Sequence, residues 1–421
     1  MTAASGQACG SAPANAAGGP LHDVRVLDLS RILAAPFTGQ ILADLGAEVI
    51  KVEKPGVGDE GRLMGPPFQP RPDGSRGDSA LYLSANRGKR SITVNIASAE
   101  GQALIRKLAL QSDVLIENYK VGDLARYGLD HAALCAINPA LIYCSITGFG
   151  QTGPARHRPG YDAIFQGMSG VMSVTGPADG QPGAGPVKIG PSLADINAGL
   201  FAAVAICAAL RERERTGLGR HVDIALLDSM LAATTHYAQS YLTSGEPPIR
   251  RGNEGNGGMP SGMYTAGDGK PFMITAGNDK QFAKLCEALG IPALATDPRF
   301  AQNAGRAENR GPLRALLEAQ FQTRSRPEWL AILDACDVPV GPVNDYAEAF
   351  AEPQVAERAM QFALPHPHNP AMPMVGSPIK FGRDPASMRP PPLVGQHSAE
   401  ILHELGLTDK EIARLQASGV V

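Results

Sequence analysis

Asp195 is the residue of this chain whose type and position best fit a chemical role. It lies in the stretch Ser192-Leu-Ala-Asp-Ile-Asn-Ala-Gly199, within the first turn of an apolar helix predicted over residues 193–214. The helix dipole favours an ionised carboxylate there, and such a carboxylate facing a cleft is a nucleophile for acyl groups. On sequence alone a structural role is the more common one for a first-turn acid, and Ser192 as N-cap with an acid three residues later resembles a capping box. The two roles are compatible, and both stay open.

A second candidate is the glycine-rich stretch GNEGNGGMPSG at residues 252–262. Clustered glycines let backbone N–H groups approach a reacting carbonyl, as an oxyanion site or a moving lid. Gly255, Gly257 and Gly258 would supply these groups. An ordinary linker between domains has the same composition, so this alternative also stays open.

Strand and helix patterns alternate through the first half of the chain. Apolar periodicity predicts strands over residues 23–29, 48–53, 91–96, 113–117, 141–146 and 221–225. It predicts helices over residues 37–45, from residue 98, and over 134–137, 193–214 and 226–241. Strands and helices at this spacing form parallel sheets with crossover helices. We therefore expect a doubly wound α/β domain.

The domain organisation follows from changes in composition. We expect a flexible extension over residues 1–20, a large domain over 21–240, a linker with the glycine loop and a smaller α/β or α+β domain over 241–345, and a C-terminal segment over 346–421. The last segment is rich in proline at residues 365–373 and 390–392, which indicates extended chain. It is expected to return to the large domain as a strap.

Composition and charge exclude several classes of protein. A formal net charge of -3 argues against a dedicated nucleic-acid-binding domain. The longest uncharged apolar run has 13 residues, 198–210, which is short of the roughly 20 that span a bilayer. Six cysteines lie far apart without a C-x-x-C pair, which is typical of reduced thiols in a cytoplasmic protein.

The common cofactor motifs are absent from the sequence. The turn after the first predicted strand, residues 30–36, contains no glycine, although a dinucleotide loop requires several. Gly88-Lys89 and Gly269-Lys270 lack the Ser or Thr that follows Gly-Lys in a P-loop. The close pair His366 and His368 has no nearby third ligand in sequence, so we expect no metal site.

Seven blocks in fixed order give the chain a resemblance to a known family, the class III CoA-transferases, also called the CaiB/BaiF family, which includes formyl-CoA transferase and carnitine CoA-transferase. The resemblance runs from residue 20 to residue 421. The blocks are VRVLDLSRILAAPFTGQILADLGAEVIKVEKPGVGD (24–59), NRGKRSITVNI (86–96), DVLIENY (113–119), SITGFGQTGP (145–154), PGYDAIFQGMSG (159–170), SLADINAG (192–199) and RTGLGRHVDIALLDS (215–229).

The resemblance implies a fold and a reaction. The fold is a Rossmann-like large domain without the dinucleotide loop, a smaller domain and a returning C-terminal segment, in an interlocked homodimer. The reaction moves CoA from an acyl-CoA to a carboxylic acid, with Asp195 as the nucleophile that forms an anhydride and then an aspartyl-CoA thioester. CoA and acyl-CoA are substrates, and no permanently bound cofactor is implied.

The resemblance also implies the residues that bind CoA, which follow the predicted strands or lie near Asp195. They are Ala34, Lys54, Val94, Asn95, Asn118, Tyr119, Lys120, Arg126, Arg158 and Tyr161. Succinyl-CoA is the expected donor. The basic residues Arg250 and Arg251, just before the glycine loop, are expected to meet the second carboxylate of a dicarboxylic acid.

Two other functions compete with this one. An α-methylacyl-CoA racemase resembles this chain in scaffold, but racemases carry His where the block Gly160-Tyr-Asp162 has Tyr161. A phenol with a pKa of roughly 10 is a poor base for racemisation, so we favour the transferase. A non-catalytic acyl-CoA-binding protein is the third alternative, and a reactive Asp195 would distinguish the enzyme from it.

Overall fold

The computed structural model describes residues 19–255, 258–381 and 388–421, and they form two units. One unit comprises Met1–Ser169, Gly190–Ala238 and Ala356–Val421, and the other comprises Gly170–Ile189 and Gln239–Val355. The chain therefore passes from the second unit back into the first at residue 356, where the sequence predicted a boundary at 346.

Residues 170–189 belong to the second unit, although the sequence placed them in the large domain. Arg250 is the physical reason. Its guanidinium pairs with Asp179 and donates hydrogen bonds to the carbonyl oxygens of Ser173, at 3.2 Å, and Pro177, at 3.3 Å. These contacts fasten a segment that lies between two large-domain stretches in sequence to the stretch around residue 250.

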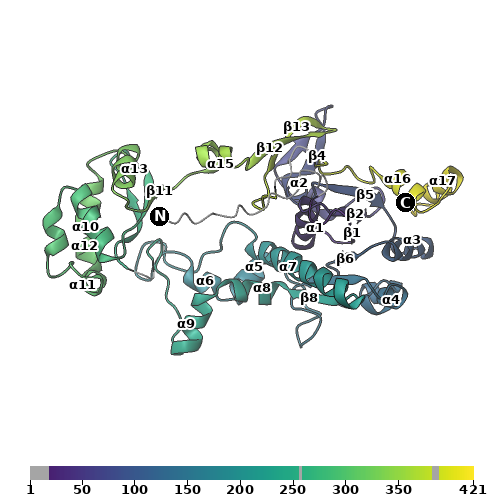
Figure 1. Ribbon diagram of the computed structural model, residues 1–421, viewed down its shortest axis with the longest axis horizontal. Coiled ribbons are helices and arrows are strands. Elements are labelled where there is room, and N and C mark those ends of the chain that lie inside the picture. The colour runs from purple at the N-terminus through teal and green to yellow at the C-terminus, as the bar shows by residue number, and fades with distance from the viewer. Residues whose placement is uncertain (1–18, 256–257, 382–387) are drawn as a thin grey trace, which may run out of the picture. The chain divides into compact units, whose positions relative to one another are not determined.

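A six-stranded parallel sheet forms the centre of the first unit, as the alternating pattern predicted (Figure 1). Its strand order is β5-β2-β1-β6-β7-β8. Successive strands of the chain are added on one side of β1 and then, from β6 onward, on its other side, as in dinucleotide-binding sheets. The strands are β1 (Arg25–Asp28), β2 (Glu48–Glu53), β5 (Lys89–Thr93), β6 (Val114–Glu117), β7 (Ile142–Thr147) and β8 (His221–Ala225).

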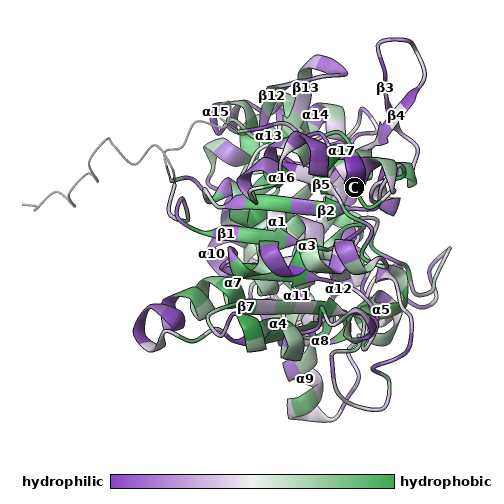
Figure 2. Cartoon of the chain, turned by 90° about the vertical axis from the view of Figure 1, so that its right-hand side faces the viewer, coloured by the Kyte–Doolittle hydropathy of each residue, from purple (hydrophilic) through white to green (hydrophobic). Residues whose placement is uncertain are grey.

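The sheet is buried, which explains its nearly continuous apolar strands. Every residue of β6 and β7 is buried, as expected for a parallel sheet covered on its faces. Figure 2 shows β1 and β2 largely in the colour of hydrophobic residues. The exceptions are buried charged residues on β1, β2 and β5, which belong to the site described below.

Helices join the strands of this sheet and cover it. They are α1 (Ala34–Asp44), α3 (Ala99–Leu110), α4 (His131–Ile137), α5 (Asp162–Met168), α7 (Leu193–Thr216) and α8 (Leu226–Ala233), with short helical turns η1 (Glu60–Leu63) and η2 (Leu124–Tyr127). Ser98 caps α3 as predicted, since its hydroxyl accepts a hydrogen bond from the Gly101 N–H at 3.0 Å. The helix predicted over residues 226–241 is instead two helices, α8 and α9 (His236–Ser244), because Thr235 adopts a positive φ of 36°.

Helix α7 is the longest helix of the described chain. Among the described residues it is the one helix long and apolar enough to cross a membrane by length and composition, and 44% of its most apolar window is buried. The sequence analysis excluded a membrane span because it considered only the longest uncharged apolar run, residues 198–210. In the fold, α7 packs against α1, α8, β7 and β8, as a core helix does.

Two further pieces complete the first unit. A hairpin of β3 (Phe68–Pro70) and β4 (Arg76–Ser79) leads into α2 (Ala80–Ser84). The proline-rich segment predicted as a strap forms a second hairpin, β12 (Gln361–His366) and β13 (Asn369–Val375), followed by α16 (Ser398–Glu404) and α17 (Asp409–Ala417). Helix α16 lies against β5, where the Ser398 hydroxyl accepts from the Thr93 N–H at 3.1 Å.

The second unit has an antiparallel sheet and its own apolar core. The sheet order is β11-β10-β9, and Trp329, Phe272 and Phe321 are buried in the core. Its elements are α6 (Val171–Val174), β9 (Ser261–Thr265), β10 (Pro271–Thr275), α10 (Asp279–Ala288), η3 (Pro292–Thr296), α11 (Asn303–Glu308), α12 (Arg310–Phe321), α13 (Arg326–Ala335), β11 (Val340–Pro342) and α14 (Tyr346–Ala351), with α15 (Pro353–Glu357) at its end.

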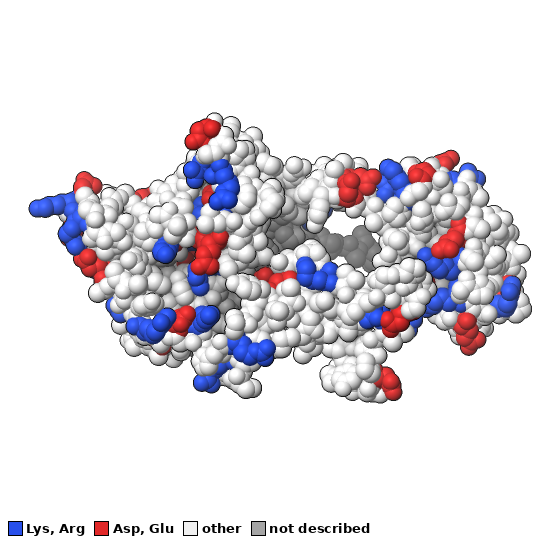
Figure 3. Space-filling view, turned by 180° about the vertical axis from the view of Figure 1, so that it is seen from behind, with Lys and Arg blue, Asp and Glu red and all other residues white. Residues whose placement is uncertain are grey.

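Charged side chains of both signs are interspersed on the face shown in Figure 3. This distribution accords with the small net charge of -3. Neither sign dominates that face.

Candidate active site

Most of the predicted CoA-binding residues lie at one edge of the parallel sheet. Parallel strands end at the same edge, so residues that follow different strands are brought together there. Lys54 follows β2, Val94 and Asn95 follow β5, and Asn118 begins the segment after β6. Tyr119 and Lys120 continue that segment, and Ala34 begins α1 after β1. The gap between β1 and β6, where the strand order reverses, is the usual ligand-binding position of such sheets.

The loop between β1 and α1 is held in an uncommon conformation at this edge. The Asn118 side chain accepts from the Arg31 N–H at 2.9 Å and donates to the Arg31 carbonyl at 2.7 Å. The Arg31 guanidinium lies over the Tyr119 ring, 4.5 Å from its centroid. Ile32 has a positive φ of 72°, which is strained for a β-branched residue, and the Asp59 carboxylate fixes it by accepting from its N–H at 3.0 Å.

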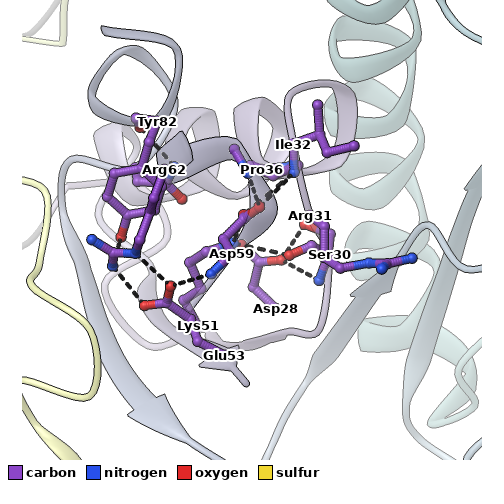
Figure 4. A network of polar contacts seen from close by, with 12 residues as sticks. Asp28, Ser30, Arg31, Ile32, Pro36, Lys51, Glu53, Asp59, Arg62 and Tyr82 are labelled. Carbon is purple, nitrogen blue, oxygen red and sulfur yellow. Dashed lines mark hydrogen bonds and ion pairs between the residues drawn. The ribbon is translucent and has the colours of Figure 1, made fainter. Parts of the chain in front are cut away.

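A buried network of ion pairs lies under this loop, and the sequence analysis does not predict it (Figure 4). Lys51 pairs with Asp59 at 2.8 Å and donates to the Ser30 carbonyl at 2.9 Å. Lys89 pairs with Asp28 at 2.8 Å, and all four charged side chains are almost fully buried. Burial alone would raise the pKa of the Asp59 carboxyl, but Lys51 outweighs it and the pKa is lowered. The signal was present as charged residues inside otherwise apolar strands.

The same network continues to Arg62, which joins the first unit's strands to its C-terminal segment. Arg62 pairs with Glu53 at 2.7 Å and donates to the Pro392 carbonyl at 2.9 Å. Its guanidinium also stacks on the Tyr82 ring, 3.7 Å from the centroid. Charge pairs of this kind fix geometry, because either partner left alone in the interior would be costly.

The predicted CoA-binding residues differ in what they can offer a ligand. Lys54, Lys120 and Arg126 are exposed cations, although Arg126 already pairs with Asp123 at 3.1 Å. Val94 is only 2% exposed and packs in the core, so its side chain is not available to a ligand. Asn95 donates its backbone N–H to the Val420 carbonyl at 2.7 Å.

Asp195 lies in the first turn of α7, next to the start of α1. Gly199, one turn further along α7, makes this approach possible. A Cβ at Gly199 would lie 2.8 Å from the Ala34 carbonyl oxygen, and the Thr38 hydroxyl donates to the Gly199 carbonyl at 3.2 Å. The close approach of α7 to α1 therefore lies at the predicted CoA residue Ala34, one helical turn along α7 from Asp195.

The N-terminus of α7 is not capped in the way the sequence suggested. Ser192 is the N-cap residue, but its side chain makes no capping hydrogen bond. The buried carboxylate of Asp162, the first residue of α5, accepts from the Ala194 N–H at 2.8 Å instead. Gln166 holds that carboxylate from the other side at 2.8 Å. Asp162 was within a block that suggested the family, but its capping role depends on a contact between segments distant in sequence.

The electrostatics of Asp195 also differ from the prediction. The sequence suggested that the helix dipole keeps this carboxylate ionised. Burial, followed by the nearby Asp162 carboxylate, raises its pKa from 3.8 to about 7. Asp195 is therefore a half-buried group that gains and loses its proton near neutral pH, which suits a nucleophile or an acid–base group.

Arg158 and Tyr161 lie in the loop that precedes α5. Tyr161 is 69% exposed and directly precedes the capping residue Asp162. Arg158 is exposed and lies over the Phe149 ring, 5.0 Å from its centroid. Both side chains are exposed at the surface of the first unit and accessible to a ligand.

The glycine stretch belongs to the second unit, whereas Asp195 belongs to the first. Gly255 donates its N–H to the Ser261 carbonyl at 3.0 Å, so this donor is engaged within the backbone and not offered to an oxyanion. Gly258 packs against Gly277, where a Cβ would lie 2.1 Å from the carbonyl oxygen. Gly257 lies outside the described residues, and its predicted role stays a prediction.

A polar pocket of about 320 Å³ lies beside the segment after β6. The predicted CoA residue Lys120 lines it together with Glu117, Ser145 and His221. Burial raises the pKa of Glu117 to about 7, and the Ser145 hydroxyl bonds the His221 ring at 3.0 Å. His131 stacks on His221, with ring centroids 4.3 Å apart. The sequence alone places Glu117 only at the end of a predicted strand, because its burial depends on strands that are distant in sequence.

Comparison with known proteins shows the family of this chain. Residues 21–398 match the sequence model of the family described as "CoA-transferase family III". Succinate–glutarate CoA-transferase of Agrobacterium fabrum is 45% identical over 92% of this chain and 96% of its own length. Human succinyl-CoA:glutarate CoA-transferase is 40% identical over 96% of this chain and 90% of its own length.

A solved structure supports the same assignment. The crystal structure of a CaiB/BaiF family protein from Brucella suis is 45% identical and superimposes with a TM-score of 0.82, covering 92% of this chain and all of that chain. Together with an aspartate at a paired helix start beside the carboxyl edge of a parallel sheet, these matches identify the chain as a member of CoA-transferase family III.

Proposed function

We propose that this CoA-transferase moves CoA from succinyl-CoA to a dicarboxylic acid acceptor such as glutarate, with Asp195 as the nucleophile. One observation supports Asp195 as the nucleophile: its carboxylate is half-buried near the contact of α7 with α1, and its pKa is raised to about 7. The names of the relatives above support the choice of acids, since they pair succinyl-CoA or succinate with glutarate.

The reaction consists of four acyl transfers. The Asp195 carboxylate attacks the thioester carbonyl, the C–S bond breaks, and an aspartyl anhydride and CoA thiolate form. The thiolate attacks the aspartyl carbonyl and releases the donor acid, which leaves an aspartyl-CoA thioester. The acceptor carboxylate attacks that carbonyl, giving a second anhydride and thiolate. The thiolate then attacks the acceptor acyl group, which yields the new acyl-CoA and restores Asp195.

The chain also supplies what the substrate needs around this centre. Lys54 and Lys120 are exposed at the carboxyl edge, which supports a role for them with the phosphates of CoA, and Asn118 orders the loop that precedes Ala34. Their positions after parallel strands support a CoA site at this edge. No permanent cofactor is needed, because the thioester itself carries the energy.

The first test replaces Asp195 with Asn and uses Asp228→Asn as a matched control. Asp228 is also an acid in the first turn of a helix of the same unit, but its side chain is exposed. We expect Asp195→Asn to lower CoA transfer at least about 1,000-fold, because it removes the covalent step, and the control to leave it unchanged. Hydroxylamine added after succinyl-CoA should modify Asp195 of the wild type, as read by peptide mass spectrometry. Full activity of the Asn variant would contradict the proposal.

We further propose an interlocked homodimer that works in the cytoplasm. Helix α7 leaves three large apolar side chains exposed in the single chain, Leu200 at 45%, Phe201 at 43% and Val204 at 68%. Apolar side chains gathered on one helix are commonly covered by a partner. A second copy of this chain is the partner that the family resemblance implies.

A further inference from the structure

A pocket of about 480 Å³ lies against the outer edge of the parallel sheet, within the first unit. It is lined by residues 365, 366, 367 and 370 of the β12–β13 hairpin and by residues 389, 390, 396 and 397, which precede α16. The second segment runs beside the edge strand β5, where the His397 N–H donates to the Ser91 carbonyl at 2.9 Å. Strands β2 and β1 separate β5 from the gap between β1 and β6. None of the lining residues is among those predicted to bind CoA, so the pocket is separate from the groups around Asp195.

Two histidines of the lining present N–H donors, because backbone contacts fix where each ring carries its proton. The His397 Nδ1 accepts from the Ser91 N–H at 3.1 Å, and the His366 Nδ1 accepts from the His368 N–H at 3.0 Å. Burial lowers the pKa of both rings, so each is neutral at pH 7 and carries its one proton on Nε2. His366 is only 4% exposed, and its Nε2 has no hydrogen-bond partner among the described residues. The Pro391 carbonyl opposes the effect of burial on the His366 pKa, but it forms no hydrogen bond with this nitrogen.

Two further side chains of the pocket are donors. The Gln396 Oε1 accepts from the Leu393 N–H at 2.9 Å, which leaves the NH2 group of Gln396 to donate. Arg389 is exposed, and within the described part of the chain its guanidinium has neither an ion pair nor a hydrogen bond. Together with the two imidazoles, the lining offers one cation and three neutral N–H donors, and none of its residues is acidic. This set of groups matches an anion.

The acids near the pocket are already paired. Burial is the largest influence on the pKa of both pocket histidines, and Glu400 and Asp78 act on them in the opposite direction. Glu400 pairs with Arg90 at 3.0 Å, and Asp78 pairs with Arg62 at 2.8 Å. Arg389 therefore brings a positive charge that no carboxylate of the described residues pairs with.

We propose that this pocket binds a phosphate monoester with a small organic body, with Arg389 as its one cation. A carboxylate has two oxygens, whereas a phosphate offers three strong acceptor oxygens and up to two negative charges, which suits four donor groups on two segments. Pockets of roughly 300–1,000 Å³ hold small organic molecules, so the volume here leaves space beyond the phosphate itself. The pyrrolidine rings of four prolines give that space apolar walls.

Calorimetric titration with three probes tests this chemistry. Phenyl phosphate has the head group and an apolar ring, benzoate has the ring with a carboxylate, and inorganic phosphate has the head group alone. We expect phenyl phosphate to bind at least about tenfold more tightly than either of the other two. If benzoate binds as tightly, the pocket does not select phosphate, and if inorganic phosphate binds as tightly, the apolar walls hold nothing. Either result, or no binding of phenyl phosphate, overturns the proposal.

Two variants assign the binding to this pocket. Arg389→Gln removes the cation, and Gln396→Glu keeps the oxygen that accepts from the Leu393 N–H but replaces the NH2 donor with a negative oxygen. We expect each variant to weaken the binding of phenyl phosphate at least about tenfold and to leave Tm of the free protein unchanged. Arg358→Gln, at an exposed arginine of the same unit outside the pocket, is the matched control and should bind as the wild type does. Wild-type affinity in either pocket variant would overturn the proposal.

A competition measurement identifies the source of the ester, because CoA itself carries a phosphate monoester on its ribose. Phenyl phosphate is titrated into protein saturated with CoA or with dephospho-CoA, which lacks that group. Competition by CoA alone identifies the ribose phosphate as the ligand, and competition by neither identifies a separate phosphate ester, so both results support the pocket. Competition by both places the probe elsewhere in the CoA site and overturns the proposal. These titrations need no turnover, so a wild type that transfers no CoA would refute the proposed function and leave the pocket standing.

Discussion

At the scale of single residues, the proposed function depends on two carboxylates with unequal roles. Asp162 is buried and fixed by the Ala194 N–H and the Gln166 amide, whereas Asp195 is half-buried and has a pKa raised to about 7. One carboxylate organises the start of α7, and its charge tunes the other. Pairs of acids whose surroundings differ in this way are typical of active sites.

The pH profile of the first acyl transfer tests this coupling. Because the nucleophile must be ionised, the rate should rise with pH up to about 7 and then level off. Asp162→Asn removes the like charge, so the rising limb should move to lower pH, although burial, the larger cause, keeps the pKa above 3.8. The measurement is the rate of CoA release under single-turnover conditions, with Asp228→Asn as the control. If the rising limb of the pH profile does not move in Asp162→Asn, the charge of Asp162 does not raise the pKa of Asp195.

The pH dependence of folding stability should also reveal the raised pKa of the Asp195 carboxyl. A carboxyl whose pKa is raised by folding binds its proton more tightly in the folded state. Below about pH 4, Asp195 therefore does not lower the free energy of unfolding. The cost grows between about pH 4 and 7 and is complete above about pH 7. We expect Asp195→Asn to raise Tm above pH 7 and to leave it unchanged at pH 4, as measured by calorimetry. A gain at pH 4 of equal size would contradict this origin.

At the scale of elements, the site exists because two helix starts pack closely. Helix α7 can approach α1 only where Gly199 leaves room for the Ala34 carbonyl oxygen. The loop before α1 is fixed in turn by Asn118 and Asp59. The packing of α7 one turn from Asp195 therefore depends on α1 and on the loop before it, and not on α7 alone.

Gly199→Ala tests this packing. The added Cβ would lie 2.8 Å from a backbone oxygen, so the helices must move apart. We expect a loss of about 1–3 kcal/mol in the free energy of unfolding, and a drop in kcat as Asp195 shifts. The matched control is Gly311→Ala in α12, where no atom lies within 4 Å of the added Cβ, and which should be neutral or stabilising by up to about 1 kcal/mol. Chemical denaturation measures both, and equal effects would refute the packing argument.

At the scale of the whole molecule, the chain leaves and re-enters its first unit. Residues Ala356–Val421 belong to the same unit as the parallel sheet, after the entire second unit has intervened. Arg62 and Arg90 attach this last segment, the first to the Pro392 carbonyl at 2.9 Å and the second to Glu404 at 2.6 Å. A chain that closes on itself in this way is compatible with the proposed interlocked dimer.

Subunit exchange tests the interlocked arrangement. Two copies of the protein carrying different tags are purified separately, mixed and incubated, and mixed dimers are measured by native mass spectrometry. We expect a dimer of two 44.0 kDa chains that does not exchange subunits over days, because exchange would require unfolding. Mixing after denaturation and refolding should give mixed dimers and serves as the control. Exchange within minutes under native conditions would rule out interlocking.

The sequence by itself determined the parallel α/β architecture, because the apolar runs of buried strands and the periodicity of helices are local patterns. It also determined Asp195 as the candidate nucleophile, since an acid in the first turn of a long apolar helix can be read locally, and the family blocks supported it. The boundaries of the smaller unit were less well predicted, because Arg250 fastens residues 170–189 to it across a gap in sequence.

Only the tertiary structure decided the protonation of Asp195, the true cap of its helix and the partner of Arg250. The protonation depends first on burial and then on the Asp162 carboxylate, the cap is Asp162 itself, and Arg250 pairs with Asp179. The buried pair of Lys89 with Asp28 is of the same kind. Burial and charge pairing are properties of groups that folding brings together, so no local pattern can specify them.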